Sequence, residues 1–378
     1  MTPFNIPLLT GEEIKFLKQV NVFNKFSGEG SFNSKCCELI KQELQCKEAF
    51  LTSSGTQALE MAAILADIKT GDEVIMPSFT FPSSANAFVL RGAKIIFVDI
   101  NPATMNIDEN LIENAISEKT KAILVVHYGS VACEMDKIVE IARKHKLILI
   151  EDAAQAYKAK YKDKFLGTIG DIGCISFHET KNIHCGEGGA ILFNNTALTE
   201  RAEIIREKGC NRNKFYRGEV DKYTWVDIGS SFLLSELNAA FLYAQLMNAD
   251  IANNRRKNIL QQYANNLAEL VKANKIDIAQ IPAHCEPNGH LFYLKTKDIS
   301  ERDKLIKHLH TNAIQACFHY VPLHSSPAGK NFGIFHHEDK YTTADSERLL
   351  RLPMFYKLKD KEVEKITNAV KQFYTAKL

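Results

Sequence analysis

Short apolar runs recur along the first half of the chain, with helix-like stretches such as 56–66 and 136–145 between most of the early ones. Apolar runs of this length are typical of buried strands. Their alternation with helices predicts an α/β fold with a mainly parallel sheet covered by helices on both faces, in which ligands bind at the carboxyl ends of the strands. The predicted strands lie at 48–52, 73–76, 94–98, 122–126, 147–150, 174–177 and 190–193.

The second half of the chain has a different pattern. An amphipathic stretch runs from Phe232 to about Leu270, is interrupted by the polar string 253–257, and predicts one or two helices that leave the large domain. The elements beyond it predict a small α+β domain. They are apolar runs at 290–294 and 316–321 and helical patterns near 302–310 and 361–374.

The length of 378 residues suits one large domain with a smaller one, and 45% hydrophobic residues permit a sizeable core. We expect a large α/β domain over residues 12–250 that holds the cofactor. We expect a small α+β domain over residues 251–378, with residues 1–11 packed on it.

The charge balance is almost neutral, with 47 Lys and Arg against 45 Asp and Glu, which argues against binding to nucleic acid or a membrane through charge. No apolar run approaches the roughly 18 residues that would span a bilayer, and the N-terminus lacks the pattern of a signal peptide. The 9 cysteines are scattered without a C-x-x-C pair, which suggests neither disulfides nor a zinc site. We expect a cytoplasmic protein without a metal, whose partners are small molecules or another copy of the chain.

Asp152 and Lys181 each lie just beyond a predicted strand. Asp152 follows the run 147–150, while Lys181 follows the run 174–177 and precedes the glycine-rich string 186–189. A lysine amine can hold pyridoxal phosphate as a Schiff base, and a fixed carboxylate can keep its pyridine nitrogen protonated so that the ring accepts electrons. A carboxylate at a buried strand end needs such a cation nearby. The alternatives are a solvated lysine and an aspartate that caps a helix or forms a structural ion pair.

A phosphate could bind close to these two residues. The string 52–59 joins a strand end to a helix start, so the backbone near Gly55 and Thr56 could hold a phosphate at the helix N-terminus. The hydroxyl of Ser176, at another strand end, could face the same phosphate. The alternative for the string is a Ser/Gly turn that only caps a helix.

Two further residues could contact a flat ring. Gln155 lies three residues beyond Asp152 and could reach the phenolic oxygen of pyridoxal phosphate if the turn is tight. Phe81 follows a strand in a proline-bounded loop and could stack on the ring, although a core phenylalanine is the equal alternative. His178 could orient the loop before Lys181. Four later histidines match no metal-binding pattern, namely His319, His324, His336 and His337.

Several strings together resemble the sugar aminotransferases of the DegT/DnrJ/StrS group, over about residues 3–373 and in the order of the family. The resemblance implies the type I, aspartate-aminotransferase-like fold of pyridoxal phosphate enzymes, with a mainly parallel seven-stranded sheet in the large domain. The strings are Ser-Gly-Thr-Gln-Ala-Leu at 54–59, Pro-Ser-Phe-Thr-Phe at 77–81, Glu-Asp-Ala-Ala-Gln at 151–155, Ser-Phe-His-Glu-Thr-Lys-Asn at 176–182, Gly-Glu-Gly-Gly at 186–189 and His-Tyr-Val-Pro-Leu-His at 319–324.

The resemblance implies that Lys181 is the catalytic lysine and that pyridoxal 5'-phosphate is the cofactor. It implies a homodimer in which the irregular stretch 209–231 reaches the neighbouring active site, and a loop of that length is usually functional. The family's Gly-Tyr-Asn-Tyr-Arg is replaced by Gly-Ser-Ser-Phe-Leu at 229–233, so Ser231 stands where an asparagine contacts the partner's cofactor. The implied cofactor contacts are Gly55, Thr56, Phe81, Asp152, Gln155, Ser176, Lys181 and Ser231.

The same resemblance implies the substrates, L-glutamate and a dTDP-linked keto-deoxyhexose used for lipopolysaccharide or enterobacterial common antigen. Amination at C3 or C4, and an axial or equatorial product, stay open. The carboxylate of glutamate has two candidate partners, Arg348 and Arg351. Candidate sugar contacts are Lys222, Tyr223, Tyr320 and His324.

Three other functions compete with an aminotransferase. A sugar dehydratase of the same fold has a histidine in place of the lysine, so Lys181 argues against it. A non-catalytic sensor or binding protein on this fold would bind ligands without cofactor chemistry. A nucleotide-sugar oxidoreductase is disfavoured because no G-x-G-x-x-G string follows the first strand.

Overall fold

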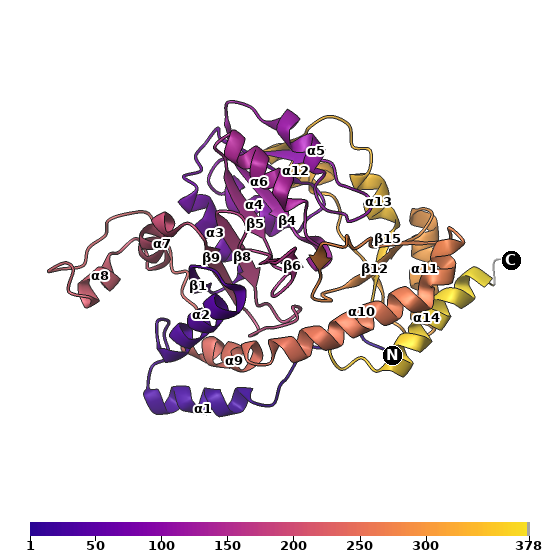
Figure 1. The fold of residues 1–378 in the computed structure, drawn as a ribbon, viewed down its shortest axis with the longest axis horizontal. Coiled ribbons are helices and arrows are strands. Elements are labelled where there is room, and N and C mark those ends of the chain that lie inside the picture. The colour runs from indigo at the N-terminus through magenta and orange to yellow at the C-terminus, as the bar shows by residue number, and fades with distance from the viewer. Residues whose placement is uncertain (376–378) are drawn as a thin grey trace.

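An eight-stranded sheet forms the centre of the larger part of the molecule, in a computed structural model that describes residues 1–375 (Figure 1). The strand order is β1-β9-β8-β5-β4-β2-β3-β14, and β9 alone runs against its neighbours. All of the predicted strands are present, which confirms the α/β fold with a mainly parallel sheet. An additional strand from far along the chain, β14, pairs with β3 at the sheet edge. The strands are β1 (Glu48–Thr52), β2 (Glu73–Pro77), β3 (Lys94–Val98), β4 (Thr120–Val126), β5 (Ile148–Asp152), β8 (Ile172–Ser176), β9 (Gly189–Phe193) and β14 (Gly333–Phe335).

Helices cover both faces of this sheet, because successive strand residues point to opposite sides and nearly all of them are apolar. On β4, for example, Ile123 and Val125 join one buried core, while Ala122 and Leu124 join the other. The first core includes α1 (Glu13–Phe23), α2 (Ser31–Leu44), α6 (Met135–Lys144) and α9 (Glu236–Leu246). The second includes α3 (Gly55–Leu65), α4 (Pro82–Val89) and α7 (Thr199–Arg206).

The predicted amphipathic stretch forms two helices, α9 and the 24-residue α10 (Ala249–Lys272). Figure 1 shows α10 running from the large sheet to the small one. The polar string 253–257 lies inside α10 and is partly buried where this helix passes from the large sheet to the small sheet. There the Asn253 side chain donates to the carbonyl of Tyr157 at 3.2 Å, and the Arg256 guanidinium donates to three backbone carbonyls.

A small four-stranded sheet, ordered β10-β12-β15-β13, carries the second part of the molecule. It packs with α10, α11 (Ile299–Thr311) and α14 (Asp360–Thr375) around a separate core that includes Tyr263, Leu294 and Leu350. At the N-terminus, Thr2 pairs with Ile314 in this part of the molecule, whereas Leu8 joins a core of the large sheet. The remaining strands are β10 (Asp277–Ile278), β12 (Phe292–Lys295), β13 (Cys317–Phe318) and β15 (Leu349–Leu352), with β6 (Lys160–Tyr161), β7 (Lys164–Phe165) and β11 (Cys285–Glu286) in a three-stranded sheet.

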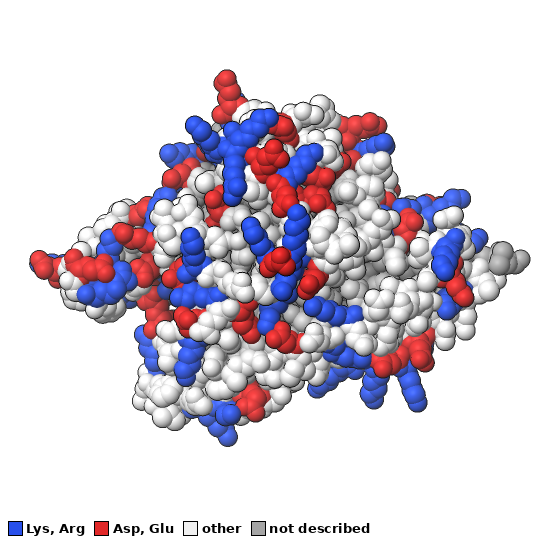
Figure 2. All heavy atoms as spheres, viewed as in Figure 1, with Lys and Arg blue, Asp and Glu red and all other residues white. Residues whose placement is uncertain are grey.

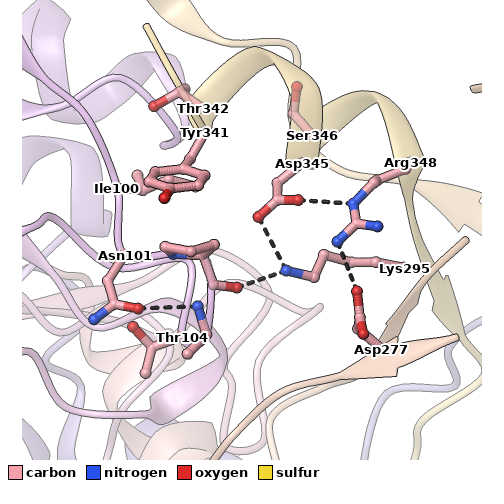
Figure 3. Close-up of polar contacts among 12 residues, drawn as sticks. Ile100, Asn101, Thr104, Asp277, Lys295, Tyr341, Thr342, Asp345, Ser346 and Arg348 are labelled. Carbon is pink, nitrogen blue, oxygen red and sulfur yellow. Dashed lines mark hydrogen bonds and ion pairs between the residues drawn. The ribbon is translucent and has the colours of Figure 1, made fainter. Parts of the chain in front are cut away.

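Polar contacts join the small sheet to the loop after β3 (Figure 3). Lys295, only 4% exposed, donates to the carbonyl of Pro102 at 2.5 Å and to Asp345 at 3.0 Å. Asp345 lies on α13 (Thr342–Arg348) and also accepts from Arg348. The carboxylate of Asp99, just beyond β3, accepts from three successive backbone N–H groups at the start of that helix. Because these charged groups are buried, removal of one of them would leave the charge of its partner unpaired, which is destabilising.

Residues 209–231 form an arm that stands away from the body of the molecule, at the left of Figure 1. The arm contains a short helix, α8 (Arg212–Tyr216), and is tied at its base by a bridge between Cys210 and Trp225. Its apolar side chains are unusually open to solvent, with Tyr216 71% and Trp225 77% exposed. Two further short helices are α5 (Glu109–Ile112) and α12 (Pro327–Phe332).

The visible surface mixes basic and acidic side chains without a large region of one sign, as the near-neutral charge predicts (Figure 2). Within residues 1–375, no helix is long and apolar enough to cross a membrane. Over the same residues, no cluster of His, Cys, Asp and Glu has the geometry of a metal site.

Candidate active site

A cavity of about 660 Å³ opens where the carboxyl ends of β5 and β8 face the small sheet. Its lining comes from segments that are far apart in sequence, between Phe4 and Met354. The position agrees with the expectation for ligands of a parallel α/β sheet. Eleven of the residues singled out by the sequence line it, namely Gly55, Thr56, Phe81, Asp152, Gln155, Ser176, His178, Lys181, His319, Tyr320 and Arg351.

Asp152 ends β5 and is held in one orientation. One carboxylate oxygen accepts from the Ser84 hydroxyl at 2.7 Å, and the other accepts from the backbone N–H of Ala154 at 3.1 Å. The Thr80 hydroxyl lies 2.8 Å from that of Ser84, which extends the network. The side chain is 6% exposed, so the structure keeps a buried carboxylate fixed at the cavity wall.

Lys181 follows β8 in a turn in which its backbone N–H donates to the carbonyl of His178 at 2.9 Å. The pKa of Lys181 is lowered from 10.5 to about 8; burial of the amine is the main cause, the Asp152 carboxylate opposes it and the Arg351 cation adds to it. Such an amine is largely neutral at mildly alkaline pH. The cavity therefore holds a lysine that can act both as a nucleophile and as a proton carrier.

The turn between β1 and α3 meets β8 at very close range. A side-chain carbon added at Gly55 would lie 2.8 Å from Cβ of Ser176, so only glycine fits here. Ser54 caps α3 by accepting from the backbone N–H of Gln57 at 3.1 Å. The hydroxyls of Thr56 and Ser83 lie 2.8 Å apart at the same corner. Backbone N–H groups, the helix dipole and several hydroxyls thus gather at one place, a combination that suits a phosphate.

Phe81 does not belong to the hydrophobic core, because 57% of its surface is exposed. The core position is taken by Phe79, which is 1% exposed and packs edge-on against Tyr128. The ring of Phe81 lines the cavity 6.2 Å from that of Tyr320 and is free to stack on a flat ligand. Gln155 accepts from the backbone N–H of Gly129 at 2.7 Å and donates to the Tyr320 hydroxyl at 3.2 Å.

His324 lies outside the cavity. Its Nδ1 lies 2.7 Å from the Ser78 hydroxyl, and its Nε2 pairs with Asp339 at 3.1 Å, which fixes the ring behind the wall. His324 is therefore not part of the cavity lining, and its contact with a sugar stays a prediction.

Lys222, Tyr223 and Ser231 also lie away from the cavity of their own chain. All three are exposed and belong to the arm, which projects from the body. Ser231 forms a β-bridge with Glu207 at the base of the arm. These residues can contribute to an active site only if the arm meets another molecule.

Several residues of the cavity were not predicted from the sequence. Ser84 orients Asp152, and His290 and Arg256 line the same space. Burial is the main reason why the pKa values of His290 and His319 lie well below the ordinary value, and the Lys181 and Arg351 cations add to it. The polar interruption of an amphipathic helix was a signal for Arg256, and His319 begins the string 319–324, whereas Ser84 and His290 carry no local signal.

These residues fit pyridoxal phosphate. A buried and oriented carboxylate, an amine with a lowered pKa, an exposed aromatic ring and a close-packed turn with free N–H groups all face one cavity. Asp152 would hold the pyridine nitrogen, Lys181 the reactive carbon and the corner near Gly55 the phosphate. The alternatives for these two residues disagree with this geometry. Among residues 1–375, Asp152 forms no ion pair and no helix begins directly after it, and the Lys181 amine is buried rather than solvated.

Known proteins are similar to this chain over most of its length. The chain is 31% identical to GDP-perosamine synthase of Escherichia coli O157:H7 over 381 residues, which cover 99% of each protein. It is 34% identical to the pleiotropic regulatory protein of Geobacillus stearothermophilus over 333 residues, which cover 87% of this chain and 86% of that protein. The putative sugar aminotransferase Spr1654 of Streptococcus pneumoniae, solved in its PLP form, superimposes with a TM-score of 0.90 at 25% identity, over 100% of this chain and 99% of the other.

A sequence profile of the DegT/DnrJ/EryC1/StrS aminotransferase family matches residues 7–371, almost the whole chain. The chain belongs to this family of pyridoxal-phosphate-dependent sugar aminotransferases of the type I fold.

Proposed function

We propose that the protein transfers the amino group of L-glutamate to the keto carbon of a nucleotide-linked keto-deoxyhexose. The observation that carries the proposal is the pairing, in one cavity, of Lys181 with its lowered pKa and Asp152 with its fixed orientation. Glutamate leaves as 2-oxoglutarate, and the sugar gains the amine in place of its keto oxygen.

When bound, pyridoxal phosphate supplies a ring that accepts the electron pair released when the substrate carbon that carries the amine loses its proton. The chain contributes the rest. Asp152, held by Ser84, would keep a positive charge on the ring nitrogen, because a buried carboxylate favours a cation beside it. The Lys181 amine would take a proton from the α-carbon of glutamate and, in the second half of the reaction, would give a proton to the former keto carbon of the sugar. A pKa of about 8 is well suited to both tasks.

The sugar we propose is dTDP-4-keto-6-deoxy-D-glucose, aminated at C4 to dTDP-4-amino-4,6-dideoxy-D-galactose. The support is a likeness to the transaminase that makes this product, in the strings 71–78, 85–94 and 221–231. Amination to the gluco epimer, dTDP-viosamine, or at C3 uses the same residues. Relatives named GDP-perosamine synthase favour a GDP-linked sugar as a second candidate.

The acceptor can be identified directly. Purified holoenzyme is supplied with L-glutamate and, in separate reactions, with dTDP- and GDP-linked 4-keto-6-deoxyhexoses. We expect NMR of the product to show an axial amine at C4 of the dTDP-sugar. An aminated GDP-sugar alone would replace the dTDP assignment with the second candidate, and no aminated sugar from either would refute the proposed acceptor class.

We also propose that the active form is a homodimer in which the arm of one subunit reaches the cavity of the other. The exposed apolar side chains of the arm, among them Tyr223 at 49% and Trp225 at 77%, support a surface covered by a second copy. Lys222, Tyr223 and Ser231 would then enter a site from which they are remote within one chain.

A non-catalytic regulator is the other candidate, because a relative of similar length is named a pleiotropic regulatory protein. Such a protein would bind ligands in the cavity without moving an amine. Incubation of the holoenzyme with glutamate separates the two functions. Release of 2-oxoglutarate supports the enzyme, and ligand binding without release supports the regulator.

A further inference from the structure

Arg351 is a cation on the cavity wall that no carboxylate neutralises among residues 1–375. It lies on β15, and its guanidinium carbon is 4.7 Å from the centre of the Phe4 ring. One terminal nitrogen donates only to the Cys317 sulfur, at 3.3 Å, and Nε is buried without a hydrogen-bond partner. A guanidinium has five N–H donors, so most of its hydrogen-bonding capacity is unused.

Arg348, three residues earlier, is a contrasting case. Its guanidinium pairs with Asp345 at 2.7 Å and with Asp277 at 2.6 Å, in the network of Figure 3. It does not line the cavity. Of the two arginines that the sequence offered as partners for a carboxylate, the structure leaves only Arg351 available to a ligand.

The other charged groups of the cavity have assigned partners or roles. Arg256 uses two of its nitrogens on the carbonyls of Gly289, His290 and Met354. Lys181 and Asp152 face the cofactor in the proposed function. Glu187, the other carboxylate of the lining, lies 3.7 Å from His178. Arg351 is therefore the cavity cation whose N–H groups are mostly left for a ligand, and its planar fork matches the two oxygens of a carboxylate.

We propose that Arg351 binds a carboxylate of the amino donor, and of the 2-oxo acid that the donor becomes. The planar fork of a guanidinium matches the two oxygens of a carboxylate, and such paired charged contacts are the strong ones. The Arg351 cation also lowers the pKa of Lys181, so the guanidinium acts on the site where the amine is transferred. The identity of the donor rests on the proposed function.

The test uses glutarate, an unreactive dicarboxylate, titrated calorimetrically into the holoenzyme. We expect Arg351→Gln to weaken glutarate binding by about 10- to 100-fold, because a charge-assisted contact is lost. The KM for glutamate should rise by a similar factor, with the KM for the sugar unchanged. Arg348→Gln is the matched control and should leave glutarate affinity within about twofold, because Arg348 lies outside the cavity.

Arg351→Lys is the second variant and covers the case in which Arg351→Gln folds poorly. It keeps the charge but loses the fork, so we expect a loss of about 3- to 10-fold. Unchanged glutarate affinity in both Arg351 variants, or absence of glutarate binding by the parent protein, would overturn the assignment. So would an equal loss of affinity for dTDP, because the cation would then serve the diphosphate. Glutarate binding and the release of 2-oxoglutarate need no sugar, so an error in the proposed acceptor leaves this test intact.

Discussion

Lys181 loses its proton more readily in the cavity than in water. Burial, aided by the Arg351 cation, lowers its pKa from 10.5 to about 8, so the neutral amine predominates above that pH and the charged amine below it. In the cofactor-free protein, we expect acylation of Lys181 to become faster with rising pH and to reach its half-maximal rate near pH 8. Peptide mass spectrometry after brief labelling gives this rate. Arg351→Gln should shift the midpoint upward, and a parent midpoint near that of a solvated lysine, about 10.4, would contradict the account.

Two elements, the start of α3 and the end of β8, meet at Gly55. Because an added Cβ would lie 2.8 Å from that of Ser176, Gly55→Ala must push the helix away from the strand. We expect a loss of about 1–3 kcal/mol in the free energy of unfolding and weaker binding of the cofactor. Chemical denaturation and cofactor titration measure the two effects. The double variant Gly55→Ala/Ser176→Gly reopens the space and should recover most of the stability. If the loss came from the helix propensity of residue 55, a change at Ser176, which lies on a strand, would not restore it.

The contact between the small sheet and the loop after β3 depends on Lys295. Replacement by Met leaves the Pro102 carbonyl and one oxygen of Asp345 without their donor in a buried place, so we expect a loss of about 3 kcal/mol in the free energy of unfolding. Lys297→Met, two residues along and exposed, is the matched control and should change stability by about 0.5 kcal/mol or less. Equal effects of the two changes in urea denaturation would show that the buried pair is not stabilising.

Elements whose pattern is local could be predicted, and those that depend on distant contacts could not. Runs such as 122–126 became strands because both of their faces are buried. The run 316–321 forms a strand only at Cys317–Phe318, because the chain then leaves the small sheet and the N–H of Leu323 bonds to Ser78 at the end of β2. Lys181 and Asp152 could likewise be identified as candidate site residues, because each follows a predicted strand in the sequence. Arg351 was one of two arginines that the sequence could not tell apart, because only packing neutralises the other.

The whole molecule exposes an arm that its own cavity does not use. If the arm completes the site of a second copy, subunits with Lys181→Ala and subunits with a shortened 209–231 segment should be inactive alone and regain activity when refolded together. At equal amounts, a statistical mixture gives about half mixed dimers with one intact site each, so about a quarter of the parental activity is expected. Activity that stays at background in proven mixed dimers would show that each chain builds its site alone.

The central claim, that Lys181 holds the cofactor, can be tested most directly by borohydride reduction of the holoenzyme followed by peptide mass spectrometry. The account predicts that the mass of the reduced cofactor appears on Lys181, in the peptide that joins β8 to the glycine-rich string 186–189. The Lys181→Ala protein should show no such mass. Attachment to another lysine, or no attachment in a protein that has bound pyridoxal phosphate, would contradict the account.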